Sequence, residues 1–181
     1  EKMLVLRKKG QEARKSFTHI AKCFQARHSD WQLHQTSQWM NQAQRLRPHF
    51  WAYLQREGQI TEPMMALRLY GNQNSWGISL EVSFIERKND EATLSKQAKV
   101  LDVPVVEGIY YSVQQHGESH IVQATEKNRQ LLKQGLSSQE IRKVLVKADV
   151  PVTDEETLDT VLDELDQTFE KLLPFYQATR N

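Results

Sequence analysis

The residues best suited to binding chemistry lie in two neighbouring segments, 65–70 and 76–85. In the second segment, large apolar residues occupy the even positions from 76 to 84 and small or polar residues the odd positions between them. Because side chains alternate across a strand, this pattern predicts a half-buried strand with one open polar face. Pairing with 65–70 in the register that buries Leu67 and Leu69 gathers a candidate ligand-binding set on that face. Its members are Arg68, Tyr70, Ser79, Glu81 and Ser83.

An arginine and a glutamate on such a floor could fix a polar ligand through charge-assisted hydrogen bonds. His116 or His120 could join them. The competing interpretation is structural: Arg68 and Glu81 would form a diagonal pair on a face that is washed by solvent or covered by a helix.

A metal-dependent reaction is the second chemistry to consider. Glu86-Arg-Lys88, at the end of the second segment, resembles the last part of the PD-(D/E)xK nuclease signature. In that signature the carboxylate holds a divalent cation and the lysine orients or activates water. The upstream Asp of the signature is absent, because the only acid near a preceding strand is Glu62. The alternative function is therefore a metal-dependent hydrolase or nuclease using Glu81, Glu86 and Lys88, against the plainer interpretation of a solvated strand end.

Basic residues concentrate in the first third of the chain. Residues 1–60 carry eleven Lys/Arg against four Asp/Glu, a net charge of +7, although the whole chain carries only +1. Cations interleaved with Trp31, Trp39 and Trp51 are the residue types that bind phosphates and stack on bases. The candidate polyanion-binding set is Arg14, Lys15, Lys22, Arg45 and Arg47, within a wider basic group that adds Arg7, Lys8, Lys9 and Arg27. Alternatively, an acidic last helix, with eight Asp/Glu and one Lys over 151–173, lies against this basic layer and the tryptophans are core.

Residues 131–145 resemble the Gly-Leu-Ser-x-x-Glu-Ile segment that joins the first two helices of bacterial regulator helix-turn-helix units. The next helix would enter the DNA major groove, yet it begins with Asp154-Glu155-Glu156. Phosphate repels three carboxylates, whereas groove readers bring Arg, Lys, Asn or Gln. A plain helical hairpin is the competing interpretation.

Several classes of site lack their signatures. The chain has no Gly-x-Gly-x-x-Gly after a strand, no P-loop and no Gly-x-Ser-x-Gly elbow. We expect no bound cofactor and assign no metal ligand, since the six histidines are irregularly spaced and Cys23 is the only cysteine. No apolar run approaches the roughly 20 residues that span a bilayer, so we expect a soluble, cytoplasmic protein without a membrane partner.

The elements that must position these residues follow from periodicity and capping. We expect helices over 3–27, from Ser29 or Asp30 to about 45, and briefly after Pro48. Two hairpins, each followed by a helix, should come next, and two further helices should close the chain. Their ranges are strands 65–70 and 76–85, helix 90–101, strands 105–113 and 120–124 with a turn at 116–118, helix 126–134, and last helices over 141–148 and from about 154 to 172.

This layout predicts one α+β domain over 1–181, with N-terminal helices, an antiparallel sheet from two β-hairpins in a ββαββα arrangement, and C-terminal helices. Its parts are a basic helical part (1–60), a sheet part (61–135) and an acidic helical part (136–181).

The segments 48–54, 67–71 and 77–84 together resemble an uncharacterised bacterial protein family, over most of the chain. The resemblance implies no established activity, so it assigns no functional residue. If it carried a dehydrogenase label, the missing dinucleotide fingerprint would argue against that label. We therefore predict a binding or interaction module for a polyanion, such as nucleic acid, or for a polar ligand.

Overall fold

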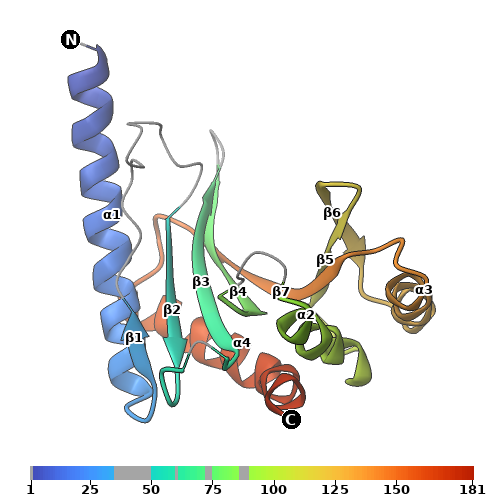
Figure 1. The fold of residues 1–181 in the computed structure, drawn as a ribbon. Coiled ribbons are helices and arrows are strands. Elements are labelled where there is room, and N and C mark those ends of the chain that lie inside the picture. Colours follow the sequence, from blue (N-terminus) through green and yellow to red (C-terminus); the bar gives the residue numbers. More distant parts are fainter. Residues whose placement is uncertain (1, 35–49, 60, 72–74, 86–89) are drawn as a thin grey trace.

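The computed structural model describes residues 2–34, 50–59, 61–71, 75–85 and 90–181. Within these residues a single antiparallel sheet is flanked by helices from both ends of the chain (Figure 1). The elements are α1 (Lys2–Arg27), β1 (Gln32–His34), β2 (Trp51–Gln55), β3 (Met64–Gly71), β4 (Trp76–Ser83), α2 (Glu91–Ala98), the 3₁₀ helix η1 (Lys99–Asp102), β5 (Tyr110–Gln115), β6 (Glu118–Gln123), α3 (Glu126–Ser137), β7 (Lys143–Val152) and α4 (Leu158–Arg180).

The sheet has seven strands in the order β1-β2-β3-β4-β7-β5-β6, and every neighbouring pair is antiparallel. Strand β7, the last in sequence, lies between the two hairpins and joins them. It pairs with β4 on one side and with β5 on the other. The register sets Leu67 opposite Leu80 and Glu81 opposite Lys147, so apolar and polar residues sort onto opposite faces of the sheet.

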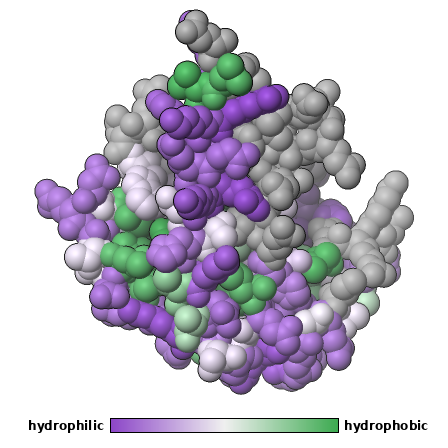
Figure 2. Space-filling model, turned by 90° about the vertical axis from the view of Figure 1, so that its left-hand side faces the viewer, coloured by the Kyte–Doolittle hydropathy of each residue, from purple (hydrophilic) through white to green (hydrophobic). Residues whose placement is uncertain are grey.

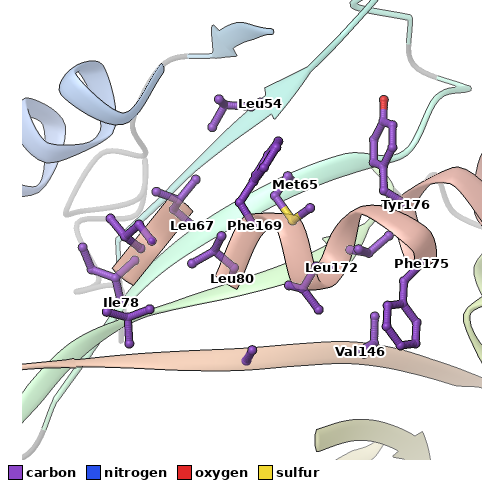
Figure 3. Close-up of a cluster of buried hydrophobic side chains, with 14 of the residues drawn as sticks. Leu54, Met65, Leu67, Ile78, Leu80, Val146, Phe169, Leu172, Phe175 and Tyr176 are labelled. Carbon is purple, nitrogen blue, oxygen red and sulfur yellow. The ribbon is translucent and has the colours of Figure 1, made fainter. Parts of the chain in front are cut away.

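The apolar face of the sheet packs against α4. Leu67, Leu80 and Val146 point from three strands toward Phe169 and Leu172 of that helix (Figure 3). All five are at most 1% exposed. The apolar stripe expected of the last helix, from Leu158 to Leu172, is confirmed from Val161 onward, whereas its first member, Leu158, is exposed. The buried members are Val161, Leu162, Leu165, Phe169 and Leu172.

The remaining helices complete the cover of the apolar face. Helix α1 stands beside β1 and β2 at one end of the sheet, and α3 lies at the other end (Figure 1). Phe17, Ala21 and Phe24 of α1 are buried in the same hydrophobic cluster as α4. Among the described residues, no helix is both long and apolar enough to cross a membrane.

The predicted α+β class, with an antiparallel sheet and helices at both ends, is confirmed. Residues 64–137 also follow the expected ββαββα order, and the turn residues His116 and Gly117 have the positive φ of a two-residue hairpin loop. The two hairpins do not form the sheet alone, however, because β7 separates them and β1 and β2 extend it.

Three predicted helices differ from the structure. The helix after Pro48 is wrong: β2 occupies Trp51–Gln55, where Ala52 and Leu54 face the core and the intervening residues face away. The helix over 141–148 is also wrong, because β7 buries Val144, Val146 and Ala148 at a spacing of two. The predicted helix from about 30 begins instead with β1, and its remainder lies outside the described residues.

Candidate functional site

The centre of the polar sheet face is a glutamate held by two cations. Glu81 Oε1 accepts a hydrogen bond of 2.9 Å from Arg68 Nε, and Glu81 Oε2 lies 3.1 Å from Lys147 Nζ. Lys147 is opposite Glu81 on β7, while Arg68 is its diagonal neighbour on β3. The Glu81 side chain is 1% exposed, against 30% for Arg68 and 18% for Lys147. The diagonal pair considered from the sequence is therefore present, with a second cation added.

Burial and the two neighbouring cations have opposite effects on the pKa of Glu81. Burial by itself raises the pKa of the carboxyl group, but attraction by Arg68 and Lys147 outweighs it, so that the pKa of Glu81 lies below its ordinary value. Glu81 is thus an ionised carboxylate whose oxygens are both committed to neighbouring side chains.

The expectation that the odd positions of β4 face open solvent is wrong. Ser79 is 3% exposed, Glu81 0% and Ser83 6%. Glu81 is enclosed between Arg68 and Lys147, which come from the strands on either side of β4. Of the five residues predicted to bind a polar ligand, only Arg68 and Tyr70 keep part of their surface.

Two tyrosines border this cluster. Tyr110 Oη donates a hydrogen bond of 2.7 Å to Asp149 Oδ1, and burial together with this carboxylate raises the pKa of Tyr110. The pKa of Tyr70 is raised by burial and then by Asp149. Both phenols therefore stay protonated, and neither provides a base near neutral pH.

Tyr70 lies directly against Gly77, so this position has no room for a side chain. A Cβ at Gly77 would collide with the Tyr70 hydroxyl and would come within 2.5 Å of the Val150 carbonyl oxygen. We expect Gly77→Ala to lower the free energy of unfolding by about 1–3 kcal/mol, because the Val150 backbone cannot move without disturbing the β4–β7 ladder. Urea denaturation measures the loss, and a cost below about 0.5 kcal/mol would contradict this packing.

The metal-dependent alternative finds no support in the described residues. Glu86 and Lys88 lie outside them, and Glu81 already has a cation at each carboxylate oxygen. Among the residues that the structure describes, no group of three or more His, Cys, Asp or Glu could hold a metal ion.

The basic face of α1 is the second candidate site. Lys8, Lys15 and Lys22 recur every seven residues, so they project on one side of the helix at intervals of about 10 Å. All three are exposed. They line a shallow groove of about 530 Å³ together with Gln11, Glu12, Arg14, Thr18 and His19. This groove lies on the side opposite the buried stripe of Phe17, Ala21 and Phe24, and Figure 2 shows the helix surface as a hydrophilic column facing the viewer.

Among the described residues, the acidic side chains of α4 form ion pairs at the C-terminal end of α1. Arg27 Nη1 lies 2.7 Å from Asp163 and 2.9 Å from Asp166, and His28 Nε2 lies 2.8 Å from Asp166. Hydrogen bonds to Asp163 and Asp166 raise the pKa of Arg27. The expected contact between the acidic and basic ends therefore exists, but in the described part of the chain it includes none of the three groove lysines.

The other residues considered for polyanion binding have three different outcomes. Arg14 lines the groove and has an interaction partner of its own. Arg45, Arg47 and Trp39 lie outside the described residues. Trp31 is 4% exposed and packs against α4, so it is core, and no base can stack on it.

The helix-turn-helix resemblance is contradicted. Residues 131–137 end α3, and the chain then turns at Gln139 into β7, so no second helix follows. Ser137 and Glu140 match the capping-box pattern of a helix start, which is why a helix was expected over 141–148, but this segment instead follows the end of α3, which Ser138 caps.

Sequence reasoning missed Lys147 because residues 141–148 were expected to form a helix. A strand signal was present as well: Val146, Ala148, Val150 and Val152 occupy alternate positions, with Lys147, Asp149 and Pro151 between them.

No family model, no curated protein and no solved structure matches the chain. The resemblance to an uncharacterised bacterial family therefore stays a prediction, and the function must be argued from the geometry alone.

Proposed function

We propose that this protein is a binding module for an extended polyanion, such as single-stranded nucleic acid, which lies along the exposed face of α1. The observation that carries the proposal is the row of Lys8, Lys15 and Lys22 on the groove side of the helix. Three cations at a regular interval fit a ligand with a repeating negative charge, because each lysine can neutralise a separate phosphate.

Three further features support a polyanion as the ligand. The groove residues other than the lysines are mostly hydrogen-bonding: Gln11, Thr18 and His19. Among the lining residues that the structure describes, Glu12 is the one acid. The acidic residues Asp163 and Asp166 of α4 pair with Arg27, which is not one of the groove-lining residues.

The polar sheet face supports a weaker case for a small polar ligand. Ser79, Glu81 and Ser83 are buried and therefore cannot contact a ligand directly. The Glu81 carboxylate is also paired with Arg68 and Lys147. We therefore place ligand contact on α1 and assign Glu81 a structural role.

The test is fluorescence anisotropy with a labelled single-stranded oligonucleotide of about 20 nucleotides. At about 50 mM salt we expect the triple variant Lys8→Gln/Lys15→Gln/Lys22→Gln to bind on the order of 10²-fold more weakly than the wild type, because three phosphate contacts are lost. The matched control is Lys96→Gln/Lys127→Gln/Lys171→Gln, which changes the net charge equally on α2, α3 and α4. Equal losses in the two triple variants would show that only overall charge matters and would overturn the site. Absence of wild-type binding at low salt would overturn the function.

A further inference from the structure

Strand β6 is an open edge of the sheet. It is six residues long, and Glu118, Ser119, His120, Ile121 and Gln123 are all exposed. Among the described residues no strand pairs with its outer side. Natural sheets protect such an edge with Pro, with Lys, with a bulge or by keeping the strand very short. Strand β6 contains no Pro, Lys or bulge, and it is not very short. The other edge, β1, has only three residues and lies beside α1 (Figure 1).

The hairpin fixes which backbone groups of β6 point outward. Gln115 and Glu118 flank a two-residue loop, so they form a hydrogen-bonded pair, and alternate residues of β6 then bond to β5. Ser119, Ile121 and Gln123 direct their N–H and C=O groups away from β5. Two contacts agree with this assignment. The outward carbonyl of Gln123 accepts a hydrogen bond of 2.8 Å from Asn128 Nδ2. On β5, the carbonyl of Gln114 points toward β7 and accepts a hydrogen bond of 2.9 Å from the Arg142 N–H.

We propose that this edge pairs with the same edge of a second copy of the chain, antiparallel about a two-fold axis through His120. In this register Ser119 of each copy exchanges two hydrogen bonds with Ile121 of the other. The four bonds use every outward N–H and C=O of these two residues in both copies. A register centred on Ile121 would instead require the Gln123 carbonyl to accept a hydrogen bond from the second copy, but this carbonyl already accepts one from Asn128 Nδ2.

Side chains in this register are complementary as well. Ile121 is 72% exposed on the monomer and would lie against Ser119 of the second copy, which removes apolar surface from water. On the other face, Glu118 lies diagonal to His120 of the second copy, and a hydrogen-bonding or charged pair forms on each side of the axis. Glu118 is the only carboxylate on the strand and has Val122 of the second copy directly opposite, so no two carboxylates meet, while His120 lies opposite His120 of the second copy.

The oligomeric state of the chain over a concentration range tests this pairing by sedimentation velocity. We expect a reversible dimer for the wild type. Ser119→Pro removes one outward N–H from each copy, hence two hydrogen bonds from the dimer, and should raise the dimer Kd at least about tenfold. Ile121→Lys places a charge at the centre of the edge and should leave only monomer. Neither change touches a bond between β5 and β6, so the circular dichroism spectrum should be retained.

Leu131→Lys is the matched control, because Leu131 is an exposed apolar residue of α3 with 51% of its surface accessible. The dimer should survive this change with an unaltered Kd. A wild type that stays monomeric up to about 0.1 mM overturns the proposal, at an affinity too weak for a specific interface. A dimer that persists in both edge variants also overturns it, and would place the contact elsewhere, for example on the exposed Leu4, Val5 and Leu6 of α1.

Discussion

Glu81→Gln should lower the free energy of unfolding by about 3–5 kcal/mol, one of the two largest losses expected for a single substitution in this chain. The change keeps the size of the side chain but removes its charge. Arg68 and Lys147 then lose the carboxylate that they share, and the Glu81 position is too buried for water to replace it. Glu107→Gln, at an exposed position, is the control and should change stability by less than about 0.5 kcal/mol.

A second variant separates loss of the carboxylate from general damage to the sheet. Replacing the whole cluster by Glu81→Leu, Arg68→Met and Lys147→Met removes both cations together with the carboxylate that they share. Because buried ion clusters can often be exchanged for apolar residues at little cost, this triple variant should be more stable than Glu81→Gln. A loss below about 1 kcal/mol in Glu81→Gln would contradict the role assigned to this residue.

The same group sets a pH dependence with a definite sign. The pKa of Glu81 is lower in the folded protein than its ordinary value of 4.5, so the folded state favours the ionised form. Its contribution is therefore complete above about pH 4.5 and is lost as the pH falls toward the folded-state pKa. Urea denaturation at several pH values should show a constant gap between wild type and Glu81→Gln from about pH 5 to 8, and a narrowing gap below about pH 4.5.

Phe169→Ala should cost a similar amount, about 3–5 kcal/mol, because it empties the contact between α1 and α4. The Phe169 ring is 1% exposed and meets Phe24 edge-on at 5.6 Å, Trp31 edge-on at 5.0 Å and His28 at 4.3 Å between ring centroids. No neighbour can collapse into the space without leaving its own partner.

Urea denaturation of three variants tests this contact. Phe169→Leu, which fills most of the volume, should lose less than half as much stability as Phe169→Ala. Leu158→Ala on the same helix is the exposed control, with 40% of the Leu158 surface accessible, and should change stability little. Equal effects at positions 158 and 169 would contradict the central place of Phe169 in the core.

The elements that the sequence predicted correctly are those with an unambiguous period. Alternation over 76–84 identified β4, and the stripe from Val161 to Leu172 identified α4, since each repeat matches only one kind of structure. Helix α3 also begins as expected, with the Thr125 side chain accepting from the Asn128 N–H.

The errors fall where one spacing fits two structures. Ile141, Val144, Leu145 and Ala148 match a helical i, i+3, i+4, i+7 pattern as well as part of a strand, and the nearby Ser137–Glu140 pair favoured the helix. The pairing of this segment with both β4 and β5 decides for a strand, and a pairing between distant segments leaves no mark in a local pattern.

Of the residues predicted to bind a polyanion, Arg14, Lys15 and Lys22 line one groove of α1, and polyanion binding there stays a prediction. The sequence spacing did not reveal which residues of the polar sheet face are buried: Ser79, Glu81 and Ser83 have polar side chains, yet all three are buried. Exposure of a short side chain depends on its cross-strand neighbours, and Lys147 was among those assigned to a helix.

The most direct test of polyanion binding on α1 is the salt dependence of oligonucleotide binding. For a single strand, each neutralised phosphate contributes about −0.7 to the slope of log K against log salt concentration. If Lys8, Lys15 and Lys22 each contact a phosphate, the slope for the variant Lys8→Gln/Lys15→Gln/Lys22→Gln should be flatter than that of the wild type by about 2. A slope that is unchanged in this variant would contradict the account, because it would show that the bound strand does not touch this face of the helix.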